Sequence, residues 1–534
     1  MRSSQNARQV RFSLTATDFG ALLLMLLVCF ALLLASSCPA QTNITGLWVL
    51  KIPTADGNVR KIFFDLKQEG ERVSGELMFG PNRGRPISDG TFRDGVLHFV
   101  VKLGQPPRRV REIVYEGTVQ GEKLLITSQY PGRAPIKGVA ERTTRKALLP
   151  PPRLPLPALH EVPDNGLART PPMGWNSWNK FGARVNDKVV REMAKAMVTS
   201  GMKAAGYAYI NIDDTWEGPR DADGNITSNR KFPNMKALAD YVHSLGLKIG
   251  IYSSPGPTTC AGYTGSYGHV QQDADAYAKW GFDYLKYDWC SETELYPISG
   301  HGYPTVGQMR AVYQEMGDAL RKTGRPIVFS LCEYGWDDPW TWGPKVGGNL
   351  WRTTGDISDN WKSMIRNGLA QLAIAKYIRP GHWNDPDMLE IGNGGMTNEE
   401  YRTHMSLWSM LAAPLIAGND LRTMSPAINA ILTNREVIAI DQDSAGKPVE
   451  RISSPAASQL VLARPLADGS LAIGLFNLAD QPQSITVKWS DVRLNGKKLR
   501  ARDLWKHRYV RVSGPSYTAK VPAHGVLLLR VESK

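Results

Sequence analysis

Several patterns that mark common protein classes are missing from this chain of 534 residues. Its five cysteines include no Cys-x-x-Cys pair and its nine histidines no His-x-x-x-His pair, so we expect no structural zinc site. Beyond the N-terminus, no apolar stretch is long enough to span a bilayer. The net charge of +14 is spread along the chain without a run of basic residues or a nucleic-acid-binding motif. We interpret it as a soluble basic surface rather than a site for a polyanion, and predict no nucleic-acid partner.

The N-terminus has the pattern of an export signal. Three arginines precede an apolar run over about residues 19–35, and small residues follow it up to Ala40. This pattern predicts a signal peptide over residues 1–40 and a secreted or periplasmic protein without a membrane span after its removal. Lipid attachment at Cys38 and an uncleaved anchor are the alternatives.

Two segments predict all-β structure. Residues 42–145 contain short strands rich in β-branched and aromatic residues, separated by Asp-Gly turns, and indicate a small barrel or sandwich. This module could bind sugar or act as a spacer, and the sequence favours neither. A proline-rich linker follows over residues 146–164. Residues 446–534 return to short strands and predict a C-terminal antiparallel β-sandwich.

Between these parts, residues 165–445 alternate hydrophobic strands with amphipathic helices, such as those over 189–197, 309–320 and 361–374. Eight such units predict an α/β fold, the (β/α)8 or TIM barrel. A doubly wound sheet would need a glycine-rich loop after its first strand, where this chain has the aromatic run 174–178. The eight strands run into residues near Trp178, Asp214, Tyr252, Asp288, Glu333, Asp356, Asp385 and Ala417.

Acidic and aromatic residues at these strand ends indicate a carbohydrate site. Carboxylates at the ends of buried strands are costly unless they are paired or used, and barrel strand ends meet at one face. Aromatic rings stack on sugars, carboxylates bind hydroxyls, and two further carboxyls can cleave a glycosidic bond.

Two carboxylates are candidates for the catalytic pair. Asp288 follows Lys286 on the same strand face, so the ammonium is expected to keep a nucleophile ionised; a structural ion pair is the alternative. Asp356 comes four residues after Arg352, and we predict that it is the general acid rather than a helix N-cap. For Asp359 we predict the cap.

Four further acids have other expected roles. Asp213 and Asp214 form an adjacent pair that sugar hydroxyls would satisfy, and too few oxygen ligands lie nearby in sequence to favour Ca²⁺. In the turn around Pro386, we expect Asp385 to bond the backbone and Asp387 to contact the ligand. No cofactor motif is present, so no cofactor or metal is predicted.

At these residues the chain resembles glycoside hydrolase family 27, the family of α-galactosidases and α-N-acetylgalactosaminidases. The resemblance covers about residues 165–445 and extends to the C-terminal β domain. The matching motifs are Ala168 to Trp178, Asn211 to Trp216, Lys286 to Cys290, Trp351 to Asp356 and Trp383 to Leu389.

The resemblance implies retaining hydrolysis of galactosides, oligosaccharides or polysaccharides, with Asp288 as nucleophile and Asp356 as acid/base. It also implies a disulfide between Cys260 and Cys290. The residues implied to bind substrate are Trp178, Asp213, Asp214, Tyr252, Lys286, Cys332, Glu333, Trp336, Arg352, Asp387 and Met388.

Two departures from the family pattern and one retained pair of acids indicate which substrate of the family this chain prefers. Thr215 stands where animal members carry a cysteine, so one family disulfide is absent. Glu333 and the aromatic residues up to Trp336 leave little room for an N-acetyl group, which favours plain α-galactosides over α-N-acetylgalactosaminides. The retained Asp213 and Asp214 argue against a β-L-arabinopyranosidase. A catalytically inactive sugar-binding protein is a remote alternative.

Overall fold

The chain is divided into two compact units, one that ends at Leu149 and one that contains Pro150–Lys534. Within the described residues, no helix is both long and apolar enough to cross a lipid bilayer. The predicted signal sequence and Cys38 lie outside the described residues. The structure is a computed structural model that describes residues 43–80, 83–103, 110–132, 134–292, 295–296, 305–452, 456–494 and 498–533.

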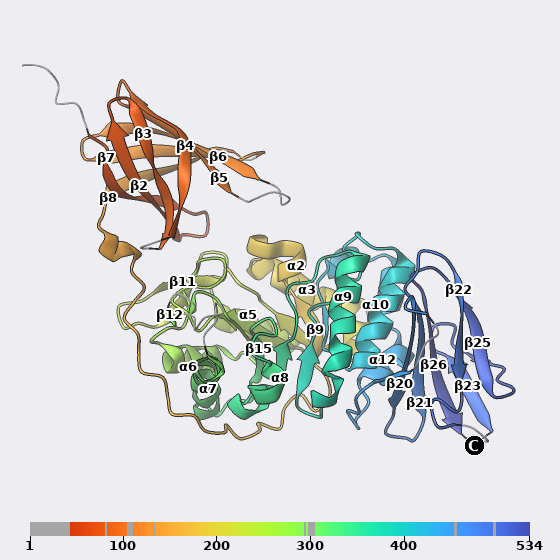
Figure 1. The fold of residues 1–534 in the computed structure, drawn as a ribbon. Coiled ribbons are helices and arrows are strands. Elements are labelled where there is room, and N and C mark those ends of the chain that lie inside the picture. The colour runs from red at the N-terminus through yellow and green to blue at the C-terminus, as the bar shows by residue number, and fades with distance from the viewer. Residues whose placement is uncertain are drawn as a thin grey trace, which may run out of the picture. The chain divides into compact units, whose positions relative to one another are not determined.

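The N-terminal unit is a closed antiparallel barrel of eight strands, drawn in red and orange in Figure 1. Each strand pairs with the next, and the first and last strands pair to close the barrel. Alternate side chains fill its interior, where the ring of Phe64 lies 5.0 Å from those of Phe99 and Tyr115. The strands are β1 (Gly46–Pro53), β2 (Val59–Glu69), β3 (Arg72–Gly80), β4 (Arg83–Arg93), β5 (Val96–Leu103), β6 (Arg111–Gln120), β7 (Lys123–Gln129) and β8 (Ile136–Arg142).

The second unit is built on an eight-stranded parallel sheet that resembles a TIM barrel. All eight strands expected from the sequence are present. Leu389, four residues after the seventh strand ends at Asp385, forms an isolated parallel bridge with Ala417: its N–H donates to the Ile416 carbonyl at 2.8 Å and its carbonyl accepts from the Gly418 N–H at 2.9 Å. In spatial order the strands are β17 (Trp383–Asp385), β16 (Leu350–Arg352), β15 (Val328–Cys332), β14 (Tyr284–Asp288), β13 (Lys248–Ser253), β10 (Tyr209–Asn211), β9 (Met173–Asn176) and β18 (Leu415–Ala417).

Helices lie between these strands in the chain and cover them. The three predicted amphipathic helices correspond to α3, α7 and α9, although α9 ends at Ala370, before a 3-10 turn. Side-chain caps fix several helix starts: Asn186 caps α3 and Asn360 caps α9, whereas Thr305 and Gln308 form a capping box at α7. The main helices are α3 (Asp187–Thr199), α5 (Met235–Ser244), α6 (Val270–Trp280), α7 (Val306–Lys322), α9 (Trp361–Ala370), α10 (Asn398–Leu411), α11 (Pro426–Leu432) and α12 (Arg435–Asp441).

The C-terminal part of this unit is an antiparallel β domain, drawn in blue in Figure 1. A six-stranded sheet carries a separate apolar core on one face, shared with a two-stranded sheet. Its other face packs on α10 through Leu462 and Leu528, so this domain shares the core of the parallel sheet. The large sheet has the order β19 (Glu450–Ile452), β20 (Gln459–Pro465), β21 (Leu471–Asn477), β26 (Val526–Ser533), β23 (Leu499–Asp503), β24 (Arg508–Val510), and the small one contains β22 (Gln483–Lys488) and β25 (Ser516–Val521).

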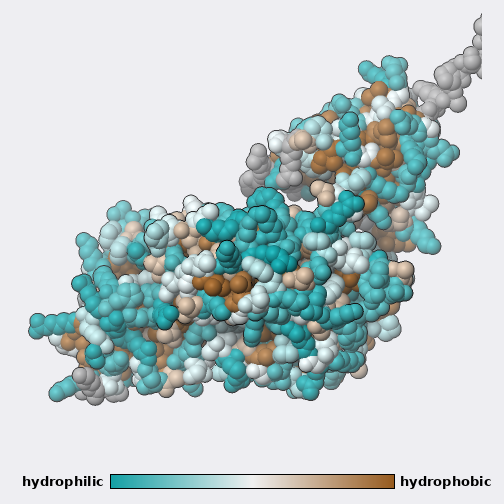
Figure 2. Space-filling model, turned by 180° about the vertical axis from the view of Figure 1, so that it is seen from behind, coloured by the Kyte–Doolittle hydropathy of each residue, from teal (hydrophilic) through white to brown (hydrophobic). Residues whose placement is uncertain are grey.

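The surface visible in Figure 2 is mainly hydrophilic. Hydrophobic residues form only small, separate areas on that face. Scattered apolar residues of this kind are usual on a protein surface. This face therefore offers no broad apolar surface for a partner.

Candidate active site

The carboxyl ends of the parallel strands surround a cavity of about 640 Å³. Because these strands all point the same way, side chains from distant parts of the sequence meet at this one end. The predicted residues that line the cavity are Trp178, Asp213, Asp214, Tyr252, Lys286, Asp288, Arg352, Asp356, Asp387 and Met388.

Asp288 is the last residue of β14, and its side chain is buried. Both carboxylate oxygens accept a hydrogen bond from a tyrosine: Tyr252 donates to Oδ2 at 3.0 Å and Tyr334 to Oδ1 at 2.7 Å. Burial raises the pKa of Asp288, while the charge of Lys286 and the hydrogen bond from Tyr334 oppose the rise. The site thus contains a carboxylate in a fixed orientation, as a nucleophile requires.

Lys286 makes its direct ion pair with Asp213. Its ammonium lies 2.9 Å from Asp213 Oδ2, which also accepts from Asn176 at 2.8 Å. Its charge reaches Asp288 only through space, where it favours the ionised form. The strand alternation correctly predicted the shared face but not the ion pair, because Asp213 comes from a neighbouring part of the sheet.

Asp214 is buried beside Asp213 and is held by two main-chain donors and by the side chain of Thr259. Its Oδ1 accepts from the Thr215 N–H at 2.6 Å and its Oδ2 from the Ala261 N–H at 2.8 Å. Burial raises the pKa of Asp214 to about 6, and the negative charge of Asp213 adds to this rise. The pair therefore presents one ion-paired carboxylate and one that gains or loses a proton near pH 6.

Asp356 follows β16, and its side chain is 70% exposed. The buried guanidinium of Arg352 lies 3.0 Å from Asp356 Oδ1 and 3.0 Å from Asp387 Oδ2. Arg352 thus joins an accessible carboxyl to a buried one. The expected cap role of Asp359 is wrong, since Asn360 caps α9 and Asp359 instead accepts from the Tyr401 hydroxyl.

The turn after β17 contains two acids in different surroundings. The Asp385 carboxylate accepts from the Asp387 N–H at 2.9 Å, and burial raises the pKa of Asp385 to about 6. Asp387 accepts from the Ile357 N–H at 2.8 Å and also lines the cavity. The first acid therefore shapes the turn and the second faces the cavity.

Three predicted substrate-binding residues are not in the cavity wall: Cys332, Glu333 and Trp336. Cys332 is fully buried behind Arg352, with Sγ at 3.7 Å from the guanidinium. Glu333 is also fully buried, and neither of its side-chain oxygens has a partner among the described residues. Tyr334 lines the cavity instead, in the turn that follows β15, where its own φ is 60°.

Sequence reasoning missed several polar residues of the cavity wall. Tyr334 lies in a turn after β15, and the others lie in short helices or loops, none of which carries a periodic pattern that marks a site. Glu390 accepts from Asn393 at 2.6 Å, and burial raises the pKa of Glu390 to about 7. The missed polar residues are Asn179, Lys180, Arg184, Tyr334, Ser358, Asp359, Glu390 and Asn393.

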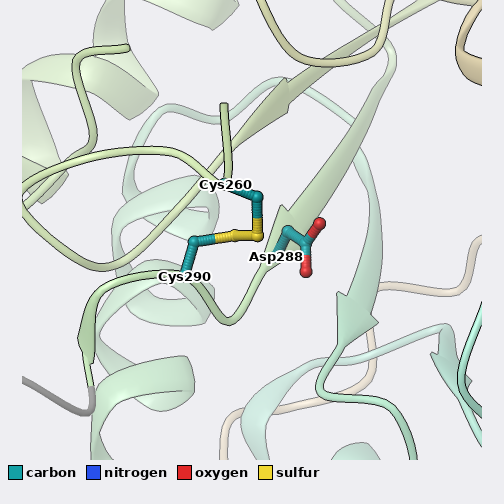
Figure 3. A group of neighbouring side chains, drawn as sticks. All are labelled: Cys260, Asp288 and Cys290. Atoms are coloured by element: carbon teal, nitrogen blue, oxygen red, sulfur yellow. A yellow bond between two sulfur atoms is a disulfide. The ribbon is translucent and has the colours of Figure 1, made fainter. Parts of the chain in front are cut away.

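The disulfide implied by the resemblance, between Cys260 and Cys290, is present. Figure 3 shows it beside Asp288 at the end of β14. The two sulfur atoms and one carboxylate oxygen lie within 4.8 Å of one another. This spacing could hold a metal, but sulfur atoms that are bonded to each other do not supply the thiolate ligands such a site needs. The group braces the loop after β13 against the strand of Asp288.

Comparisons with known proteins agree with this geometry. Residues 170–443 match the family model described as "Alpha galactosidase A", and residues 457–531 match "Alpha galactosidase C-terminal beta sandwich domain". An α-galactosidase from Cyamopsis tetragonoloba is 47% identical over 366 residues, which cover 68% of this chain and 86% of that protein.

Solved structures are similar to this chain in both sequence and fold. The crystal structure of α-galactosidase I from Mortierella vinacea is 39% identical, with a TM-score of 0.64, and covers 69% of this chain and 98% of its own. A Bacteroides fragilis structure is 32% identical, with a TM-score of 0.64, and covers 92% of this chain and 96% of its own. The chain therefore belongs to glycoside hydrolase family 27 and is a glycosyl hydrolase with α-galactosidase activity.

Proposed function

We propose that the chain removes terminal, non-reducing α-D-galactosyl residues by a retaining double displacement. The observation that carries this proposal is the contrast between the two candidate carboxyls of one cavity. Asp288 is buried and oriented by two tyrosine hydroxyls, whereas Asp356 is accessible and can exchange protons with a leaving group or water. Retaining glycosidases need one carboxyl as nucleophile and one as acid/base.

In the first step, an Asp288 oxygen attacks the anomeric carbon and Asp356 gives its proton to the departing glycosidic oxygen. A galactosyl ester on Asp288 and a free alcohol result. In the second step, Asp356 takes a proton from water as the water oxygen attacks the same carbon. The ester bond breaks, so Asp288 leaves as a carboxylate, Asp356 is again protonated, and galactose is released with its configuration retained.

The remaining cavity residues would hold the galactosyl ring. Asp213, Asp214 and Lys286 form a polar group suited to the O4 and O6 hydroxyls, and Trp178, 37% exposed at the cavity, offers a ring for stacking. Arg352 would orient Asp356 and Asp387 on the other side. These contacts fix the anomeric carbon next to the catalytic pair.

The catalytic assignment is tested with two alanine variants and azide. Asp288→Ala and Asp356→Ala should each lose nearly all activity on a nitrophenyl α-galactoside. Azide should restore turnover in both but with opposite products: β-galactosyl azide from Asp288→Ala, and α-galactosyl azide from Asp356→Ala. The reverse pattern would exchange the two roles, and full activity in either variant would refute the pair. Absence of wild-type turnover would leave a sugar-binding protein.

Preference for plain galactose is the finer part of the proposal. Tyr334, rather than Glu333, supplies the bulk next to the nucleophile, since its hydroxyl contacts Asp288. We expect hydrolysis of nitrophenyl α-galactoside far above that of the α-N-acetylgalactosaminide or the β-L-arabinopyranoside. A higher kcat/KM for either of the last two would assign the chain to that specificity instead.

The finer architecture and location also belong to this proposal. We infer a (β/α)8 barrel closed at Leu389, followed by a β-sandwich, with the chain exported after removal of residues 1–40. A disulfide at the cavity is compatible with an oxidising compartment. Mass spectrometry of the exported protein tests this: an N-terminus at Gln41 supports cleavage, and a lipidated Cys38 supports the alternative anchor. A variant that lacks residues 42–145 should be compared with the full chain on small and on polymeric substrates. This comparison tests whether the N-terminal module contributes to the hydrolysis of polymers only.

A further inference from the structure

Thr215, which directly follows Asp214, has an unusual backbone conformation. Its φ is 85°, in the left-handed region that β-branched residues rarely adopt. A conformation of this kind persists only when surrounding contacts impose it, and it is typical of functional sites. The contacts that impose it here therefore bear on where the Asp214 carboxylate points.

Every polar group of Thr215 is hydrogen-bonded. Its N–H is shared between Asp214 Oδ1 at 2.6 Å and Glu217 Oε2 at 3.0 Å. Its hydroxyl accepts from Lys231 Nζ at 2.8 Å, and its carbonyl accepts from the Asn229 amide at 2.8 Å. Glu217 is the first residue of β11 (Glu217–Arg220), and Asn229 and Lys231 follow β12 (Ile226–Ser228), the second strand of the same hairpin. Hydrogen bonds from this hairpin and from the residues after it therefore fix the conformation of Thr215.

Glu217 is the unexplained member of this group. It is 1% exposed and does not line the cavity, so it has no direct contact with a sugar. Its Oε1 has no hydrogen-bond partner among the described residues, and its Oε2 contacts the Thr215 N–H. A buried carboxyl is costly to a folded protein, which calls for a role beyond packing.

We propose that Glu217 is a positioning residue that holds Thr215 in its left-handed conformation and so directs the Asp214 carboxylate into the cavity. The same N–H bonds both carboxyls, so a change of the Thr215 backbone would move the donor that orients Asp214. Ala261 anchors only the other Asp214 oxygen and leaves the Thr215 backbone free. The inference rests on the proposed role of Asp214 in binding galactose.

The first test is the kinetics of Glu217→Ala and of Glu217→Leu, which keeps more of the volume. Both should raise KM for a nitrophenyl α-galactoside and the inhibition constant of galactose about tenfold, the effect of one buried hydrogen bond. Since hydroxyl contacts act equally in the ground and transition states, kcat should change less than about threefold. Glu217→Gln should restore a KM near wild type, because its amide oxygen can still accept from Thr215.

The second test removes the strain itself. Glycine adopts a φ of 85° without cost, so Thr215→Gly should need no support from Glu217. Adding Glu217→Ala to the Thr215→Gly variant should raise KM less than about twofold, against about tenfold in the wild-type background. An equal factor in both backgrounds would refute the proposal, as would unchanged KM in Glu217→Ala and Glu217→Leu.

Two controls separate this inference from other outcomes. Asp441→Ala removes another fully buried carboxylate, on α12 and outside the cavity wall, and should lower Tm without changing KM. If Glu217→Ala behaves in the same way, its role is structural only and the inference is wrong. If Asp214→Ala leaves KM unchanged, the proposed sugar contact fails; if it raises KM while Glu217→Ala does not, only the present inference fails.

Discussion

The disulfide between Cys260 and Cys290 gives a prediction that links stability to substrate binding. The two cysteines are 30 residues apart in sequence. In the chain-entropy description, closing a loop of this size stabilises the folded state by about 3.6 kcal/mol at 25 °C. Over the roughly 380 residues from Pro150, an unfolding entropy of about 2.1 cal/mol/K per residue converts this loss into a fall in Tm of about 4–5 °C.

Loss of the bridge should also weaken galactose binding. Ala261 follows Cys260 directly, and its N–H is the donor to Asp214 Oδ2. A loosened loop weakens this hydrogen bond to a charged group, so KM should rise by a factor between about 2 and 10. The change in kcat should be smaller, because neither cysteine touches the reacting atoms in the proposed mechanism.

The assay compares wild type with Cys260→Ala/Cys290→Ala by thermal unfolding and by nitrophenyl α-galactoside kinetics, each with and without reductant. Reductant should bring wild type to the Tm and KM of the double variant, and should leave the double variant unchanged. An unreduced double variant with wild-type Tm and KM would refute the reasoning. A KM that rises without a fall in Tm would refute the entropy argument alone.

Three further changes have defined outcomes. Tyr334→Phe removes a donor to the nucleophile's carboxylate, so the pKa of that group rises and the acid limb of the kcat/KM profile should move to higher pH; an unmoved limb contradicts the hydrogen bond. Arg464→Met removes the guanidinium that donates to the buried carbonyls of Ser409 and Ile440 and to the partly buried carbonyl of Lys447, and should cost about 2–4 kcal/mol in chemical denaturation. Gly343→Ala places a Cβ 2.6 Å from the buried Trp351 ring and should cost about 1–3 kcal/mol, while Gly307→Ala, whose Cβ meets only the Thr305 hydroxyl at an ordinary contact distance of 3.9 Å, should not destabilise the fold.

Much of the fold could be predicted from the chain because its signals are local. Strands of the parallel sheet are short continuous apolar runs, such as the fully buried β15, and helices α3, α7 and α9 show apolar spacing of 3.6 residues. Closure of the N-terminal barrel through the pairing of β1 with β8 had no such signal. That pairing joins segments about ninety residues apart, which periodicity does not reveal.

The candidate site also has a part that the sequence predicted and a part that it did not. Asp288 and Asp356 stand at strand ends, so a pattern of hydrophobic residues running into an acid was enough to find them. Glu333 lies outside the cavity wall because β15 ends at Cys332 and the chain turns there, which a strand pattern does not predict. Tyr334, one residue later, lines the cavity.

The sequence by itself determined which strands form and which acids stand at their ends, because both follow from side-chain periodicity and from the cost of burying a charge. Only the tertiary structure decided the partner of each acid. Lys286 pairs with Asp213, and Asp214 receives its second donor from a loop beyond the next strand. Hydrogen bonds are made across space to whichever donor the fold brings within about 3 Å, and that distance is set by the packing of segments far apart in the chain.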